Sequence, residues 1–261
     1  EIAYKEIRIE DLSAANSQVM VESLLNSENI PQGLKDFVET KTQGNPFYLE
    51  EMINSLVESK VLLKKDNEWL LQRKITKADI SSSIQGVITA RVDRLESESK
   101  QILQEAAVIG RSFYYEIINR ISEIKKDINL CLENLEGFDL IKSHESKIDL
   151  EYMFKHALTQ EVVYNGLLKT DRQLIHEKIG QVIEQVFNDR LSEFYETLAH
   201  HFSKGKSILK AVDYLMKSGE KSIKRYSVEE AHQYFQKAFD ILKAAPEKTQ
   251  EVNDLFLDLV N

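Results

Sequence analysis

Residues 43–52 read Gln-Gly-Asn-Pro-Phe-Tyr-Leu-Glu-Glu-Met. This order predicts that one helix stops at Gly44 and that another starts at Pro46, because glycine is favoured just beyond a helix and proline at its first position. Apolar side chains then recur at intervals of three and four residues, which indicates one buried helix face; they are Leu49, Met52, Ile53, Leu56 and Val57. The rest of the chain is organised around this turn and the helix that follows it.

The composition is typical of a chain with more than one domain and a mostly helical fold. Of 261 residues, 42% are hydrophobic and 30% are charged, and only 9 are glycine and 3 proline. Two or three packed units are expected at this length. The one cysteine, Cys131, excludes an internal disulfide framework and is typical of a reducing compartment, so we expect a cytoplasmic location. No apolar run approaches the roughly 18 residues that span a bilayer, and we expect no membrane association.

The N-terminal residues predict a strand without its sheet. Residues 4–9 alternate polar and apolar side chains, as an edge strand does. Such a strand needs neighbouring strands to pair with, and the chain starts at Glu1 instead of methionine, so we expect a fragment that lacks an upstream domain. Ser13 or Asn16 is expected to cap the first helix, and a short helix is expected between Pro31 and Gly44.

Two hairpins and several capped helices follow the landmark turn. Strands at 61–63 and 69–71 predict the first hairpin. Serines 81–83 cap a helix, a second begins after Ser97 or Ser99, Phe113 starts a short third, and Asp127 caps a fourth that closes at Gly137. Strands at 140–141 and 148–154 predict the second hairpin. Helices followed by a two-stranded wing indicate a winged helix.

Everything after residue 156 is expected to be helical. One apolar face includes Leu191, Phe194 and Leu198, and the clearest lies near residues 228–242. Small and aromatic residues fall at tetratricopeptide-repeat positions; they are Gly219, Ala231, Phe235 and Ala238. Other repeat positions match poorly, and no second copy is visible one repeat length earlier. We expect an array of helical hairpins that is only weakly tetratricopeptide-like.

The sequence contains no motif for catalysis or metal binding. His-Glu-x-x-His, Cys-x-x-Cys and Gly-x-Ser-x-Gly are all absent. His200 and His201 are adjacent and diverge on a helix, so a structural or surface role is expected. Glu50 and Glu51 diverge in the same way, so we interpret them as a solvated face instead of a catalytic pair. A phosphate-binding Gly-x-x-x-x-Gly-Lys-[Ser/Thr] loop is also absent, so the sequence shows no means of holding a triphosphate for hydrolysis.

Charge also argues against nucleic-acid binding. The net charge is −9, and the candidate recognition helix of the winged helix, residues 127–139, carries four acidic residues and no Lys or Arg. Such a helix would repel phosphates instead of releasing counterions. We therefore expect the winged helix to serve as a packing module.

Four ordered segments resemble the signal-transduction (STAND) ATPases. The first is Gly-Asn-Pro-Phe-Tyr-Leu-Glu-Glu at 44–51, and the second joins residues 90–95 to 106–113. The third is Phe-Lys-His-Ala-Leu at 154–158, which continues to Tyr164, and the fourth is Leu-Ala-His-His-Phe at 198–202. The resemblance is greatest to the ATPase regions that bacteria attach to adenylate or guanylate cyclase, kinase or transcription-factor domains.

This resemblance implies a modular switch. In the family, a P-loop domain binds ADP or ATP with Mg²⁺, a helical lid and winged helix close over it, and a repeat region senses partners. The chain would divide into residues 1–80 (the end of the P-loop domain plus the lid), 81–168 (winged helix) and 169–261 (helical hairpins). The parent protein could be an ATPase linked to a cyclase; this fragment is expected to catalyse nothing and to hold no cofactor by itself.

The resemblance assigns nucleotide contacts to Gly44, Asn45, Pro46 and His156, each dependent on the missing P-loop domain. Pro46 would pack against the adenine, and the imidazole of His156 would donate to the β-phosphate. Many relatives have an aspartate where this chain has Ala157. Two plainer interpretations stay open, namely a helix-starting proline at Pro46 and a packing histidine at His156.

The expected partners are the upstream P-loop domain and a protein or small effector on the helical region. Two alternative functions remain. A helical scaffold would use an aromatic groove with residues such as Tyr195, Tyr226 or Tyr234, and a transcription regulator would use the winged helix.

Overall fold

The computed structural model describes residues 8, 10–66, 68–76, 79–124, 127–145 and 150–245. The strand expected at residues 4–9 lies, except for Arg8, outside the described residues. The chain forms two compact units, Glu1–Leu95 and Glu96–Asn261. The division into three domains at residues 80 and 168 stays a prediction.

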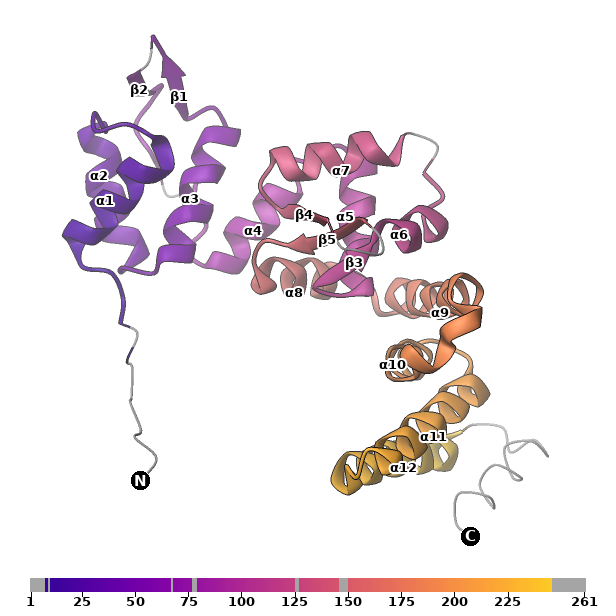
Figure 1. The fold of residues 1–261 in the computed structure, drawn as a ribbon. Coiled ribbons are helices and arrows are strands. Elements are labelled where there is room, and N and C mark those ends of the chain that lie inside the picture. Colours follow the sequence, from indigo (N-terminus) through magenta and orange to yellow (C-terminus); the bar gives the residue numbers. More distant parts are fainter. Residues whose placement is uncertain are drawn as a thin grey trace. The chain divides into compact units, whose positions relative to one another are not determined.

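Three helices enclose the core of the first unit (Figure 1): α1 (Ala14–Leu25), α2 (Gln32–Thr42) and α3 (Pro46–Glu58). Of the two residues expected to cap the first helix, Ser13 is the cap, because its hydroxyl oxygen accepts the Asn16 N–H at 3.2 Å. The core is centred on α3, where Leu49, Met52 and Leu56 are fully buried. The helical periodicity therefore identified the correct face.

A hairpin and a fourth helix complete the first unit. Strands β1 (Leu62–Lys65) and β2 (Glu68–Leu71) pair antiparallel, with Leu63 opposite Leu70. The Trp69 indole N–H donates to the Leu25 carbonyl at 2.8 Å, which fixes the hairpin to α1. Helix α4 (Ile84–Val92) starts after Ser83, whose hydroxyl accepts the Gly86 N–H at 3.2 Å, and it packs on α3.

The second unit begins with the expected helix-and-wing layout. Its helices are α5 (Ser97–Ile109), α6 (Tyr115–Ile121) and α7 (Ile128–Gly137), followed by strands β4 (Ile141–Glu145) and β5 (Leu150–Phe154). Asp127 caps α7 by accepting the Asn129 N–H at 2.9 Å. The fold class predicted from the sequence, mostly α with small β-hairpins, is confirmed.

A third strand corrects the expectation that Phe113 starts a helix. Phe113 lies in β3 (Ser112–Tyr114), which pairs with β5 to give a sheet of order β3–β5–β4. Its ring stacks on Tyr152 with centroids 5.7 Å apart. So short a strand cannot show alternation, and α6, α7 and β4 separate it from its partner in the sequence, so local pattern could not reveal it.

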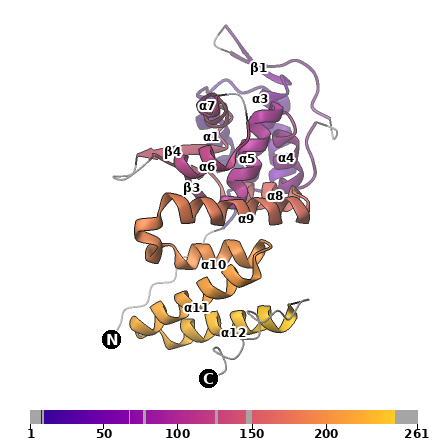
Figure 2. The ribbon, with the colours of Figure 1, turned by 90° about the vertical axis from the view of Figure 1, so that its right-hand side faces the viewer.

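Helix α8 (Ala157–Gly166) packs on α5 and β5. The helices that follow stack in sequence (Figure 2): α9 (Lys169–Val186), α10 (Tyr195–Lys204), α11 (Ile208–Lys224) and α12 (Val228–Ala244). A 3-10 helix, η1 (Asn188–Glu193), separates α9 from α10. The expectation that Leu191 and Phe194 share a helix face with Leu198 was wrong, because Leu191 lies in η1 and Phe194 precedes the first residue of α10. Phe194 instead stacks on Phe187, with centroids 4.2 Å apart.

Two glycine–phenylalanine contacts repeat along this stack. A Cβ on Gly180 would lie 2.7 Å from Phe202, and a Cβ on Gly219 would lie 2.5 Å from Phe235. The first pair is separated by a longer stretch of sequence than the second, and η1, which lies between Gly180 and Phe202, accounts for the difference. The same kind of close contact therefore occurs twice in the stack, at two different separations in the sequence.

Within the described part of the chain, no helix has the length and apolar character needed to cross a membrane.

Candidate functional site

The turn before α3 fits only glycine at position 44. Helix α2 ends at Thr42, and Gln43 and Gly44 both take positive φ values, 50° and 80°. A Cβ on Gly44 would lie 2.3 Å from the backbone oxygen of Leu12, while the Leu12 N–H donates to the Gly44 carbonyl at 2.8 Å. The turn is therefore held against the segment that precedes α1.

The next two residues, Asn45 and Pro46, form an exposed tip. The Asn45 side-chain oxygen accepts the Tyr48 N–H at 2.9 Å and so caps α3, with Pro46 as its first residue. Tyr48 itself is buried, and its hydroxyl donates to the Ser81 carbonyl at 2.6 Å. The tip thus presents polar and apolar surface from an anchored helix.

Glu51 corrects the interpretation of Glu50 and Glu51 as a solvated face. The side chains of Glu51 and Arg91 are each only 1% exposed, and Arg91 Nη1 lies 2.6 Å from Glu51 Oε2. Arg91 Nε also donates to Glu58 Oε1 at 2.8 Å. Burial raises the pKa of Glu51, and the charge of Arg91 opposes this shift. The first segment singled out in the sequence, 44–51, therefore meets the first part of the second, 90–95, inside the first unit.

His156 lies in the second unit, at the junction of β5 and α8. It precedes the first residue of α8, is half-buried, and its carbonyl accepts the Thr159 N–H at 3.1 Å. The neighbouring Lys155 forms an ion pair with Asp139. Gly44, Asn45 and Pro46 thus lie together in one unit and His156 in the other, and their joint contact with a nucleotide stays a prediction.

A buried histidine pair escaped the sequence reasoning. The Nδ1 atoms of His176 and His201 lie 2.8 Å apart, so one ring donates a hydrogen bond to the other, and the Tyr164 hydroxyl lies 3.1 Å from His176 Nε2. Burial lowers the pKa of His176 to about 3 and the pKa of His201 well below its ordinary value. The two histidines belong to different helices, and neither the α9 nor the α10 pattern alone indicates the pair.

The geometry does not create an obvious metal centre. Among the residues that the structure describes, no group of three or more His, Cys, Asp or Glu side chains is arranged to hold a metal ion. The described polar clusters instead form helix contacts, as in the pairs Glu51–Arg91 and His176–His201.

No family model matches this chain. A segment of 92 residues is 30% identical to "Uncharacterized protein R02095" of Rhizobium meliloti (strain 1021). The match covers 34% of this chain and 9% of that protein, so the similarity is limited to a small part of a much longer relative.

Proposed function

We propose that this chain is the regulatory part of a STAND-type signalling ATPase. In this proposal it contacts ADP or ATP, with Mg²⁺, that a P-loop domain elsewhere in the protein holds. The observation that carries the proposal is the tip: Asn45 and Pro46 are exposed, whereas Gly44, Tyr48 and Glu51 on either side are buried. The resemblance assigns nucleotide contacts to both exposed residues and to the buried Gly44 beside them.

The anchoring of the tip supports a binding role. Gly44 is held by Leu12, Tyr48 by the Ser81 carbonyl, and Glu51 by Arg91. A surface that is already fixed loses little conformational entropy when it binds. The proline ring offers a flat apolar face to a base, and the positive end of the α3 dipole favours a nearby phosphate.

His156 has the chemistry that the second half of the proposal requires. An imidazole N–H can donate to a phosphate oxygen, and the junction of β5 with α8 holds the backbone of His156 through the Thr159 N–H. In the proposed switch, nucleotide exchange changes the contacts at Pro46 and His156. The stacked helices α9–α12 would sense a partner or effector and so control a linked cyclase, kinase or transcription-factor output.

Calorimetric titration with ADP tests this proposal. We expect negligible binding to the 261-residue chain and tight binding to a longer protein that adds a P-loop domain upstream. In the longer protein, His156→Ala should weaken binding by about tenfold or more, the effect of losing a hydrogen bond to a charged group. The control is His144→Ala, at an exposed position on β4. Equal affinity of the short and long proteins would refute the proposal.

A second candidate function, a helical scaffold for a protein partner, is favoured by the turn between α11 and α12. Tyr226 is 94% exposed, and Ile223 and Val228 beside it are also exposed. Of the three tyrosines expected in a contact groove, Tyr195 and Tyr234 are half-buried. A photo-crosslinking residue at position 226 should capture one defined partner, and the same residue at the exposed Asp240 should not. Equal labelling from both positions would count against a scaffold.

The transcription-regulator alternative receives no such support. The exposed residues of α7 include Asn129, Leu130 and Glu133 and no Lys or Arg. A helix with this face offers no cation to DNA phosphates. We therefore do not propose DNA binding.

A further inference from the structure

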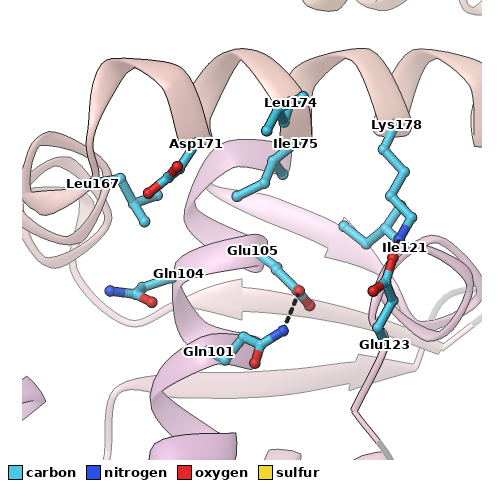
Figure 3. Close-up of a pocket in the computed structure, with 10 residues that line it drawn as sticks. All are labelled: Gln101, Gln104, Glu105, Ile121, Glu123, Leu167, Asp171, Leu174, Ile175 and Lys178. Atoms are coloured by element: carbon cyan, nitrogen blue, oxygen red, sulfur yellow. Dashed lines mark hydrogen bonds and ion pairs between the residues drawn. The ribbon is translucent and has the colours of Figure 1, made fainter.

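The second unit contains a cavity of about 380 Å³ between α5 and α9 (Figure 3). Helix α5 contributes Gln101, Gln104 and Glu105, and the facing side of α9 contributes Leu174 and Ile175. The volume is within the range of small-molecule sites, which are concave, mostly apolar and carry a few convergent polar groups. This cavity has an apolar wall, formed by Leu174 and Ile175, and a polar wall, formed by the α5 side chains.

Glu105 is the polar centre of the cavity. It is 9% exposed, and Figure 3 shows its carboxylate in the space between Gln101, Ile121 and Ile175. One carboxylate oxygen, Oε1, accepts from Gln101 Nε2 at 2.9 Å. The other, Oε2, is buried and accepts no hydrogen bond of ordinary geometry from any residue that the structure describes, although the Ser122 side chain also stabilises the carboxylate. A buried carboxylate oxygen without a donor is costly, and a ligand that supplied a donor would remove this cost.

The charges around the cavity select the sign of that ligand. Asp171 and Glu123 add two further carboxylates to the lining. Among the described residues that line the cavity, the positively charged side chain is Lys178. It already forms an ion pair with Glu123, because Lys178 Nζ lies 2.6 Å from Glu123 Oε1. The potential at Glu105 therefore favours a positive group over an anion.

The apolar wall selects the body of the ligand. Leu174 is exposed along the cavity, and Ile175 lies beside it. A bare metal ion would gain nothing from these side chains, and the described residues hold no cluster of three or more metal-binding side chains. An organic cation with an apolar portion satisfies both walls at once.

We propose that this cavity binds a small organic ammonium ion, with the ammonium group donating to Glu105 Oε2 and the apolar portion packed on Leu174 and Ile175. The proposal goes beyond the nucleotide switch and does not depend on it, because none of the residues it uses is among the proposed nucleotide contacts Gly44, Asn45, Pro46 and His156. It assigns a ligand class to a cavity that the resemblance leaves without a role.

The titration of Glu105 provides an independent signature. Burial raises the pKa of the Glu105 carboxyl, and Glu123 adds to this effect; the Gln101 and Ser122 side chains and the Lys178 ammonium oppose it. A bound ammonium favours the ionised carboxylate. Near the raised pKa, binding should therefore release a proton, and the calorimetric heat should change with the ionisation enthalpy of the buffer.

Calorimetry and protein NMR with 2-phenylethylammonium chloride test the proposal on the whole chain, and 2-phenylethanol is the matched neutral probe. We expect saturable binding of the ammonium, at least about tenfold weaker binding of the alcohol, and resonance shifts centred on the residues that line the cavity. Glu105→Gln preserves the shape of the side chain and should weaken ammonium binding by about tenfold or more, the effect of removing a charge-assisted hydrogen bond.

A second variant does not alter Glu105. Leu174→Lys places a tethered ammonium at an exposed position on the cavity wall and should abolish binding of the free ammonium. Asp240→Asn, at an exposed carboxylate on α12, is the control and should bind as the wild type does. The proposal fails if the wild type shows no saturable binding, if the alcohol binds equally well, or if folded Glu105→Gln retains full affinity.

Discussion

Arg91 Nη1 lies 2.6 Å from Glu51 Oε2, and both side chains are only 1% exposed. This contact joins α3 to α4, since Glu51 follows the turn at Gly44–Pro46 and Arg91 lies in the last turn of α4. Arg91 also reaches Glu58 through its Nε and Nη2 atoms. The pair fixes the helix that carries the proposed nucleotide contacts.

Removing one member of this pair should unfold the first unit at lower denaturant concentrations. Arg91→Met leaves the Glu51 carboxylate buried without its partner, and the expected loss is about 3–5 kcal/mol of unfolding free energy. Chemical denaturation followed by the fluorescence of Trp69, the one tryptophan, reports on this unit. The matched control is Arg73→Met, because Arg73 pairs with Asp79 from a half-exposed position and should lose far less. Similar losses of unfolding free energy in the two variants would show that the buried ion pair stabilises the unit no more than the exposed one.

Much of the first unit could be predicted because its signals are local. Ser13 and Ser83, like Asp127 in the second unit, lie close in the sequence to the N–H groups that they cap, and the apolar spacing of α3 is contained in one helix. Glu51 was misassigned because its partner lies on another helix, and an isolated helix pattern cannot tell a buried carboxylate from a solvated one. Phe113 was misassigned for the same reason, since β3 is defined by its pairing with β5.

The histidine pair predicts a loss of stability in acid. Both histidines have a pKa below the ordinary value of 6.5 in the folded chain, about 3 for His176. As the pH falls below 6.5 the unfolded chain takes up protons first, so the unfolding free energy decreases until the folded pKa is reached. Between pH 6.5 and pH 5 we expect a loss of about 1.6 kcal/mol from His176, since a full proton difference is worth about 1.4 kcal/mol per pH unit and the unfolded imidazole is half protonated at pH 6.5. His201 should add to this loss in the same direction.

His176→Gln should reduce this slope. The amide does not titrate, so the variant should lose less stability than the wild type between pH 6.5 and pH 5, even if it is less stable at pH 7. Thermal unfolding across this range is the measurement. The control is His144→Gln, at an exposed position on β4, which should leave the wild-type slope intact. If His176→Gln lost stability with falling pH as steeply as the wild type does, His176 would not be the source of the acid sensitivity.

Tyr226 should be a site where glycine increases stability. It has a φ of +60° and follows the C-cap of α11. The Tyr226 N–H donates to the Ile223 carbonyl and the Ser227 N–H to the Ser222 carbonyl, each at 2.9 Å. This is the hydrogen-bond pattern of a helix end at which glycine is favoured, because a left-handed residue with a Cβ is strained by about 1–2 kcal/mol.

Tyr226→Gly should therefore raise the unfolding free energy of the second unit by about 1 kcal/mol, measured by thermal unfolding with circular dichroism. Tyr226→Ala is the matched control, because alanine loses the aromatic ring but keeps the strain. If both variants change stability equally, the effect comes from the ring and not from the backbone. A stabilised Tyr226→Gly that no longer binds the partner identified by crosslinking would explain why a tyrosine occupies this position.

The two glycine–phenylalanine contacts supply the last prediction. Repeat patterns depend on fixed spacing, and η1 shifts Phe202 away from the spacing that Gly219 and Phe235 show. Gly219→Ala should destabilise the second unit by about 1–3 kcal/mol, the effect of overpacking a close contact, because the added Cβ would lie 2.5 Å from the Phe235 ring. Gly180→Ala should do the same against Phe202, and thermal unfolding measures both losses.

The controls for these variants separate the contact from the helix propensity of alanine. At Gly137 an added Cβ meets no atom within 4 Å, so Gly137→Ala should be neutral or slightly stabilising. Combining Gly219→Ala with Phe235→Leu should recover part of the loss, since the smaller side chain makes room for the methyl group. A double variant that is no better than the sum of its single changes would separate the two residues energetically and remove the contact as the reason for the glycine.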